Sequence, residues 1–162
     1  MQTVFADAKF TVIAEPMSIP CEAFNATRQQ YRSDNILGMI RNYAEKTDDF
    51  DQVLGIMDVD IYVPRLNFVF GQAESPGKAA LISLWRLKPE FYGNKPNPEA
   101  FLERSTKEAV HELGHTLGLL HCVNPFCVMY FSNSIFETDR KKSFFCNKCY
   151  LKTKVHDNRA RR

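Results

Sequence analysis

The chain has 162 residues, of which 44% are hydrophobic and 25% are charged, and its formal net charge is +2. This length suits about one domain, and the composition is that of a globular protein with an apolar core. No apolar run reaches the roughly 18 residues that a membrane helix needs, and the first residues lack the basic and apolar pattern of a secretory signal. We therefore expect a cytoplasmic protein with no membrane partner, and nothing in the sequence demands more than a monomer.

Positive charge is concentrated near the C-terminal end. Residues 139–162 carry nine lysines or arginines and two aspartates, a net charge of +7, so the first 138 residues carry −5. Such asymmetry is one mark of proteins that bind nucleic acids. No basic helical face or set of stacking aromatic residues accompanies it, so the sequence favours a solvated tail and cations around a thiolate-rich metal site.

The first third of the chain predicts a strand followed by a helix. Residues 9–15, KFTVIAE, are rich in β-forming side chains and predict a strand that Pro16 ends. Apolar residues at helical spacing between residues 24 and 46 predict one long helix, with a break near Ser33 and Asp34.

Three further strands are predicted, in residues 52–63, 66–73 and 79–87. The last two are joined by the segment ESPGK, whose Pro-Gly pair indicates a turn. The order strand, helix, strand, strand, strand predicts an α/β layer with one helical crossover and an antiparallel edge.

A second helix is expected to begin at Pro98, which suits the first helical position, with Asn97 as its N-terminal cap. Apolar or small side chains recur at spacings of three and four and predict a face turned to the core: Leu102, Thr106, Ala109, Leu113 and Leu117. Gly118 is expected to end the helix, because glycine accepts the left-handed conformation of a helix C-terminus.

Three histidines follow the spacing H-E-x-x-H-x-x-G-x-x-H. His111 and His115 are four residues apart, so on a helix both can direct a ring nitrogen at one metal ion. Glu112 is rotated by about 100° from His111, which places its carboxylate beside the ion, where a general base for metal-activated water belongs. His121 can join them only if the chain turns first, and Gly118 permits that turn. Three neutral imidazoles leave a coordination position open on Zn²⁺ and give bound water a pKa near 7.

Four of the five cysteines form two close pairs in the last quarter of the chain: Cys122, Cys127, Cys146 and Cys149. Without a secretion signal, such a cluster indicates metal more often than disulfides. Four thiolates in a tetrahedral array form a closed structural zinc site. A redox dithiol at Cys146 and Cys149 is the alternative, but it leaves the other pair unexplained.

The thiolates would give such a zinc site a net charge of −2, which nearby lysines are expected to offset: Lys141, Lys142, Lys148 and Lys152. Cys21 stands apart and is expected to be a small buried apolar residue.

The combined pattern resembles the archaemetzincin family of metzincin-type zinc metallopeptidases. Its motif HExxHxxGxxH is followed at once by a cysteine, then by a further cysteine, a methionine and a closing CxxC. The preceding segments LNFVFGQA and ALISLWRL also look like this family, so the resemblance covers residues 9–150.

The resemblance implies two zinc ions per chain, one catalytic on the three histidines and one structural on the four cysteines, with Glu112 as general base. Met129 would lie in a methionine turn beneath the catalytic zinc. The implied metzincin-like α/β fold has a twisted, mostly parallel sheet with one antiparallel edge strand above the cleft, which we place at residues 67–72. An extended peptide could pair with the free edge of that strand. Tyr130 does not stand where some metzincins carry a functional tyrosine, so no role is assigned to it.

We therefore expect a single metalloprotease domain over residues 1–162. Its parts would be an α/β subdomain over residues 1–118, which ends with the active-site helix, and a small irregular C-terminal subdomain over residues 119–162. The expected activity is zinc-dependent hydrolysis of peptide bonds. The alternatives are a non-catalytic zinc-binding module and a nucleic-acid-binding protein that uses the basic cysteine-rich lobe.

Endopeptidase and aminopeptidase activity are not separated by the sequence. An aminopeptidase would need an acidic group to hold the α-amine of its substrate. The candidates are Asp58, Asp60, Glu74 and Glu108.

Overall fold

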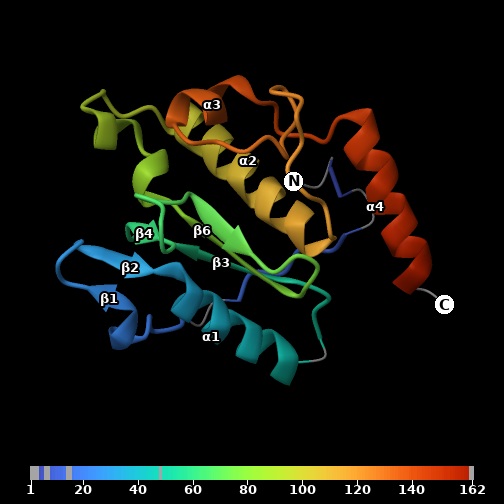
Figure 1. Ribbon diagram of the computed structural model, residues 1–162, viewed down its shortest axis with the longest axis horizontal. Helices are drawn as coiled ribbons and strands as arrows, with labels where there is room; N and C mark the ends of the chain where they lie inside the picture. The colour runs from blue at the N-terminus through green and yellow to red at the C-terminus, as the bar shows by residue number, and fades with distance from the viewer. Residues whose placement is uncertain (1–3, 6–7, 14–15, 48, 161–162) are drawn as a thin grey trace.

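The computed structural model describes residues 4–5, 8–13, 16–47 and 49–160, with side chains described as far as residue 153. The four helices in this part of the chain are α1 (Ser33–Lys46), α2 (Pro98–Thr116), α3 (Ile135–Arg140) and α4 (Asn147–Ala160). The strands are β1 (Phe24–Asn25), β2 (Gln30–Arg32), β3 (Val53–Met57), β4 (Ile61–Tyr62), β5 (Gly71–Ala73) and β6 (Ala79–Ser83). Helices α1 and α2 lie on opposite sides of the strands, and α3 lies beyond α2 (Figure 1).

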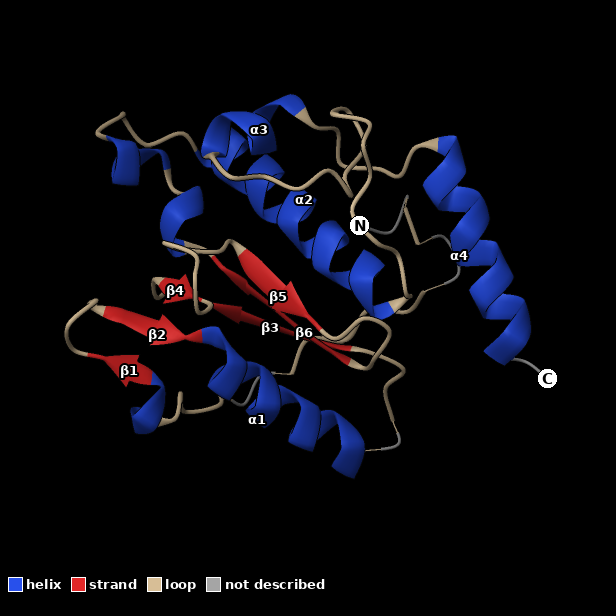
Figure 2. Cartoon of the chain, viewed as in Figure 1, coloured by secondary structure: helices blue, strands red, loops and turns tan. Residues whose placement is uncertain are grey.

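These strands form two three-stranded sheets, in the orders β1-β2-β4 and β3-β6-β5 (Figure 2). In the larger sheet β6 is central, parallel to β3 and antiparallel to β5. All five residues of β6 are buried, as a strand covered on both faces by helices requires. The predicted α/β class and its antiparallel edge strand are confirmed. The single sheet of the prediction is divided in two, because the chain leaves β3 at Met57 and pairs again, at β4, with β2.

Helix α2 begins and ends where local signals predict. The Asn97 side-chain oxygen accepts a hydrogen bond from the Ala100 amide at 3.0 Å, and Pro98 is the first helical residue. At the other end Gly118 has φ = 80°, its amide bonds the His115 carbonyl, and the Leu119 amide bonds the Gly114 carbonyl. This paired arrangement is the glycine-dependent termination called the Schellman motif.

The predicted core-facing stripe of α2 is wrong at its start. Leu102 is 68% exposed, whereas Ala109 and Leu113 are buried. The buried residues of α2 all lie in its later turns, from Lys107 onward. There even His111 and Glu112, which lie off the stripe, are buried.

The long helix expected over residues 24–46 is wrong in its first part. Helix α1 begins at Ser33, the position of the predicted break, and the residues before it form the β1-β2 hairpin. Phe24 and Tyr31 are partners across that hairpin, with ring centroids 5.0 Å apart. A separation of seven residues therefore reflects a cross-strand contact here and not two turns of helix.

Three strand predictions also need correction. Residues 9–13 form no strand and are exposed, and residues 14 and 15 lie outside the described residues. Their β-forming side chains have no ladder partner among the described residues. The region 52–63 contains two strands that belong to different sheets, and the strand predicted over 79–87 ends at Ser83 before a 3₁₀ turn, Trp85–Leu87.

The part after Gly118 is not as irregular as expected, because it contains α3 and α4. Cys21 is exposed and not buried.

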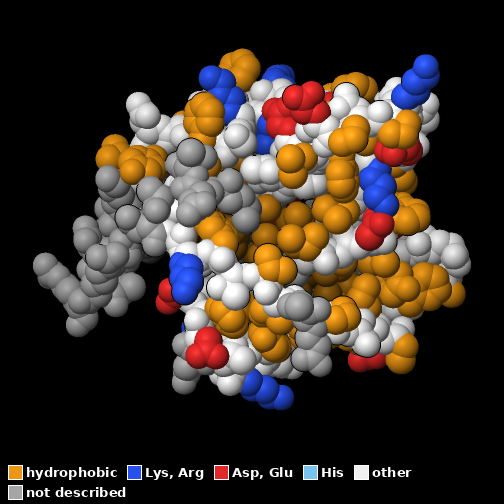
Figure 3. Space-filling model, turned by 180° about the vertical axis from the view of Figure 1, so that it is seen from behind, with side chains coloured by type: hydrophobic (Ala, Val, Ile, Leu, Met, Phe, Trp, Pro, Cys, Tyr) orange, Lys and Arg blue, Asp and Glu red, His pale blue; other side chains and the backbone are white. Residues whose placement is uncertain are grey.

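The face of the molecule opposite to the view of Figure 1 carries a broad gathering of apolar side chains (Figure 3). None of the helices in the described part of the chain combines the length and apolar character that a bilayer crossing requires.

Candidate metal centres and active site

The three histidines of the sequence motif meet at one point. His111 and His115 lie on the last turns of α2, and His121 returns to them after the turn at Gly118. One ring nitrogen from each of the three lies within 4.8 Å of the others. The Nε2 atoms of His111 and His115 are 3.1 Å apart.

Backbone carbonyls fix the orientation of two of these rings. His111 Nδ1 is 2.7 Å from the Val128 carbonyl oxygen, and His115 Nδ1 is 2.7 Å from that of Leu119. A carbonyl only accepts, so each Nδ1 carries the proton and each Nε2 turns its lone pair toward the other. Burial lowers the pKa of all three histidines, which keeps them neutral near pH 7.

This arrangement fits a metal ion. Two lone pairs that face each other at 3.1 Å repel unless a proton or a cation lies between them. Nitrogen ligands at about 2.0–2.1 Å from a tetrahedral zinc would stand about 3.3 Å apart, close to the observed separation. A set of three protein ligands, such as these neutral imidazoles, leaves the fourth coordination position of zinc free for chemistry.

Glu112 lies directly beside this cluster and is buried. Burial, and then the carboxylate of Glu108 one turn earlier, raise the pKa of Glu112 well above its ordinary value, whereas Lys141 lowers it. A Cβ placed on Gly71 would come within 2.6 Å of both Cγ and Oε1 of Glu112. The edge strand β5 therefore approaches the Glu112 carboxylate so closely that only glycine fits there.

The histidines and Glu112 line a cleft of about 430 Å³. Strand β5 and the loop before it form one wall, α2 forms the floor, and the residues that follow Met129 form the other wall. Phe131, in this second wall, lies with its ring 4.8 Å from that of His121. The antiparallel edge strand thus borders the cleft, in the position expected for residues 67–72, although only Gly71–Ala73 has strand geometry.

The four acidic candidates for an amine-binding group are separated by the fold. Asp58, Asp60 and Glu74 pair with Lys88, Arg86 and Arg41 respectively, and none of the three lines the cleft. Glu108 does line it, and its Oε1 atom is 3.0 Å from Lys141 Nζ.

Lys141 therefore has a different partner from the one predicted. Its fully buried side chain pairs with Glu108 and was expected to offset the charge of the cysteine cluster. A charge removed from water needs a close counter-ion, and Glu108 provides it.

The four cysteines gather in a second cluster. Their sulfur atoms all lie within 4.8 Å of one another, and the Cys122 and Cys146 sulfurs are 3.9 Å apart. Sulfur ligands at about 2.3 Å from a tetrahedral zinc would stand about 3.8 Å apart. Burial acts to raise the pKa of Cys146, but hydrogen bonds from the Cys149 backbone and from the other thiols lower it to about 7. The set is thus suited to a metal and, as free thiols, contains no disulfide.

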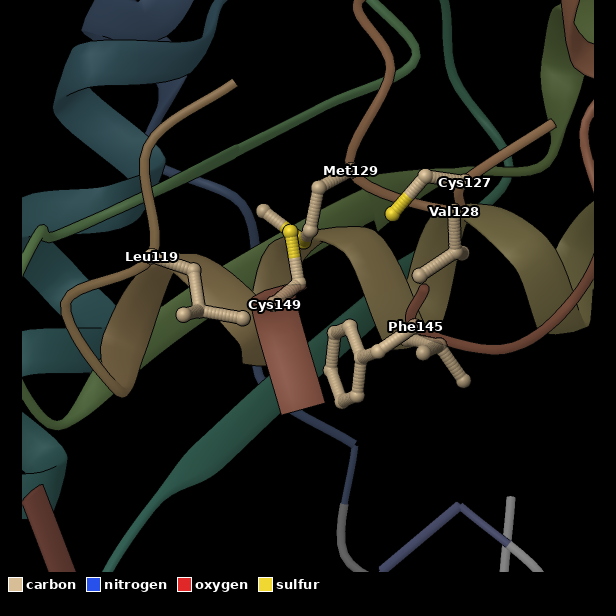
Figure 4. Packing of buried hydrophobic residues seen from close by; sticks show 7 residues of the cluster. Leu119, Cys127, Val128, Met129, Phe145 and Cys149 are labelled. Carbon is tan, nitrogen blue, oxygen red and sulfur yellow. The ribbon is translucent and has the colours of Figure 1, made fainter. Parts of the chain in front are cut away.

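A small apolar core contains Cys127 and Cys149 together with Leu119, Val128, Met129 and Phe145 (Figure 4). Met129 is fully buried in it, and its sulfur lies against Gly114, the residue before His115. The Cys122 amide bonds the Met129 carbonyl at 2.9 Å, so the chain between His121 and Met129 is a closed loop. Cys127 and Cys149 belong both to this core and to the cysteine cluster.

The model of Peptidase family M54 matches residues 13–155 of the chain. The chain belongs to this family. The resemblance to the archaemetzincins is confirmed by relatives that carry this name, and the assignment as a zinc-dependent metallopeptidase agrees with the histidine cluster. Among these relatives is the archaemetzincin of Methanocaldococcus jannaschii, which is 50% identical over 140 residues, 86% of this chain and 75% of the relative.

The likeness to solved structures extends to the fold. The archaemetzincin of Methanopyrus kandleri is 43% identical, with a TM-score of 0.75, over 88% of this chain and 73% of that one. A zinc-dependent peptidase from Methanocorpusculum labreanum is 33% identical, with a TM-score of 0.79, over 87% of this chain and 83% of that one.

Several residues of the site could not be found from the sequence. Gly71 is about 40 residues from the glutamate that it contacts, and the Glu108–Lys141 pair joins residues 33 positions apart. The carbonyls that orient His111 and His115 carry no side-chain signal at all.

Proposed function

We propose that His111, His115 and His121 hold a catalytic zinc ion and that Glu112 acts as the general base in the hydrolysis of peptide bonds. The observation that carries this proposal is the convergence of three neutral imidazoles, with the Nε2 atoms of two of them 3.1 Å apart, beside a buried carboxylate in an open cleft. Membership of Peptidase family M54 supports the same activity.

The proposed mechanism combines a metal ion with one carboxylate of the chain. When bound, zinc polarises the scissile carbonyl and lowers the pKa of water toward about 7. Glu112 takes a proton from the attacking water and then delivers it to the leaving amine. Burial of Glu112 in the cleft floor holds its carboxylate in one place during both transfers.

We further propose a structural zinc ion on Cys122, Cys127, Cys146 and Cys149, which gives two zinc ions per chain. The sulfur separations support it, as does the burial of Cys127 and Cys149 in the core next to the histidine cluster. A closed set of four thiolates leaves no position for substrate, so this ion would stabilise the fold and take no part in the reaction.

The peptide substrate is proposed to bind in extended conformation along β5. That strand pairs with β6 on one side, and within the described residues no strand pairs with its other side, which borders the cleft. An extended peptide can complete such an edge through main-chain hydrogen bonds, while alternate side chains enter pockets.

We also propose a single domain made of residues 1–118 and 119–162, and a monomeric state. A cytoplasmic location is proposed because the five cysteines are free, and thiols persist in a reducing compartment. A nucleic-acid partner is not favoured, because Lys141, one of the basic residues behind that idea, is buried in an ion pair.

The test is a peptide-library cleavage profile of the native chain and of Glu112→Ala. The variant should keep both metals and lose hydrolysis by about a hundredfold or more, because the proton acceptor is gone. Libraries with free and with acetylated N-termini distinguish aminopeptidase from endopeptidase activity. Undiminished cleavage by Glu112→Ala would exclude the assignment of the base, and absence of any cleavage by the metal-loaded native chain would favour a non-catalytic module.

A further inference from the structure

A fully buried lysine, Lys141, pairs with Glu108, which lines the cleft. The Lys141 side chain is 0% exposed, and its Nζ is 3.0 Å from Oε1 of Glu108, whose side chain is 4% exposed. Glu108 lies on α2 three residues before His111 and four before Glu112, and it lines the cleft together with them.

This ion pair joins three separate segments. The same Glu108 oxygen accepts a hydrogen bond from the Thr138 hydroxyl of α3 at 3.0 Å. Lys141 Nζ also donates to the carbonyl of Tyr130 at 3.5 Å. Tyr130 follows the buried Met129 and precedes the residues that form the second wall of the cleft, Phe131, Ser132 and Asn133. The floor and this wall are thus connected through one lysine.

We propose that Lys141, through Glu108, is a positioning residue that holds the wall formed by residues 131–133 at a fixed place above α2. A peptide in the cleft would then lie at a fixed place relative to Glu112. The proposal rests on the proposed function and goes beyond the metal ligands and the general base.

The fold does not need this pair to attach α3 to α2. Arg104 of α2 already binds Asp139 of α3 through two hydrogen bonds of 2.7 Å, and Lys107 donates to the Asp139 carbonyl at 3.0 Å. Neither Arg104 nor Lys107 lines the cleft. Moreover, a buried ion pair is generally no more stabilising than apolar groups of the same shape. Stability alone therefore does not account for the buried Glu108–Lys141 pair. Its place beside the cleft suggests a role there.

The test compares two double variants. Glu108→Gln/Lys141→Met removes both charges, keeps the side-chain lengths and leaves an amide oxygen to accept from Thr138. Its melting temperature and zinc content should remain close to those of the native chain. Its kcat, measured per zinc-loaded folded chain, should fall about tenfold or more with a smaller change in KM, because a displaced wall misplaces the bound peptide.

Arg104→Met/Asp139→Asn is the matched control, since it removes a neighbouring ion pair, between α2 and α3, whose residues do not line the cleft. It should lower the melting temperature and leave kcat per folded chain unchanged. A second readout, independent of activity, is amide hydrogen exchange at residues 131–133, which should be at least about tenfold faster in Glu108→Gln/Lys141→Met alone.

Native kcat or native exchange rates in Glu108→Gln/Lys141→Met would overturn the proposal. If the native chain cleaves no peptide, the proposed function fails, and the exchange measurement still decides whether Lys141 fixes the wall.

Discussion

The space around the Glu112 carboxylate depends on the lack of a side chain at Gly71. Gly71 of β5 faces its carboxylate, and a Cβ there would come within 2.6 Å of Glu112 and 2.7 Å of the Leu81 carbonyl oxygen. The side chain of Glu112 could rotate away from such a contact, but the Leu81 carbonyl belongs to β6, the central strand. An alanine at residue 71 must therefore displace the edge strand, the glutamate, or both.

The variant Gly71→Ala should accordingly bind zinc as the native chain does and hydrolyse peptides about tenfold to a hundredfold more slowly, since a base displaced by about 1 Å has this effect. The measurement is kcat with zinc content determined on the same sample. Gly38→Ala is the control, because the nearest atom to a Cβ there is 4.0 Å away, in the flexible side chain of Arg41. In α1 this change should keep activity and stabilise the helix by about 1 kcal/mol. Full activity of Gly71→Ala would show that the close approach has no catalytic consequence.

At the residue scale the sequence predicts the groups that carry chemistry and misses those that arrange them. The spacing of His111, His115 and His121 on either side of Gly118 is a local code for convergence, and the structure brings the three together. Gly71 and Lys141 contact partners that are many residues away in the chain. No local motif distinguishes them from other glycines or lysines of the sequence.

At the scale of elements, local signals decide what can be predicted. The boundaries of α2 follow from Asn97, Pro98 and Gly118, which act on the backbone within one turn. The hairpin before α1 was missed because the contact between Phe24 and Tyr31 imitates helical spacing. Strand formation depends on pairing partners that are distant in sequence. Residues 9–13 are rich in β-forming side chains but have no such partner among the described residues, so they form no strand.

The loop from Leu119 to Met129 is the element that both candidate metal centres share. Its carbonyls at Leu119 and Val128 orient two histidines, while Cys122 and Cys127 belong to the cysteine cluster. Adjacent residues point to opposite sides where a chain is extended, and such a conformation would let His121 and Cys122 serve different ions. We propose that a metal ion on the four cysteines supports the loop that returns His121 to the other histidines.

Cys149→Ser, which changes a residue far from the histidine motif in sequence, should therefore weaken binding of the catalytic zinc. Loss of supporting contacts to metal ligands typically costs about tenfold to a hundredfold in affinity. Competition with a chromophoric chelator measures this affinity, and Cys21→Ser, at an exposed cysteine outside the cluster, is the control that should bind as the native chain does. An unchanged affinity in Cys149→Ser would mean that the two centres are independent.

At the scale of the whole molecule, the α/β class and the antiparallel edge strand were predictable because they follow from the order of elements and from family resemblance. The division into two sheets was not predictable, because it depends on the pairing of β4 with β2 and not with β3. Helices α3 and α4 lie in a region whose cysteine spacing indicates a metal site and carries no strong helical signal. The cleft lies between the edge strand β5 and α2, the helix whose two ends are best predicted by the sequence.

The number of zinc ions that the chain holds tests the two-centre assignment most directly. A native mass spectrum of the chain, purified with zinc and without strong chelators, counts them in one measurement. We predict two ions per chain as the main species, one for the three histidines and one for the four cysteines. A main species with one ion or none would contradict the two-centre assignment on which the proposed mechanism is built.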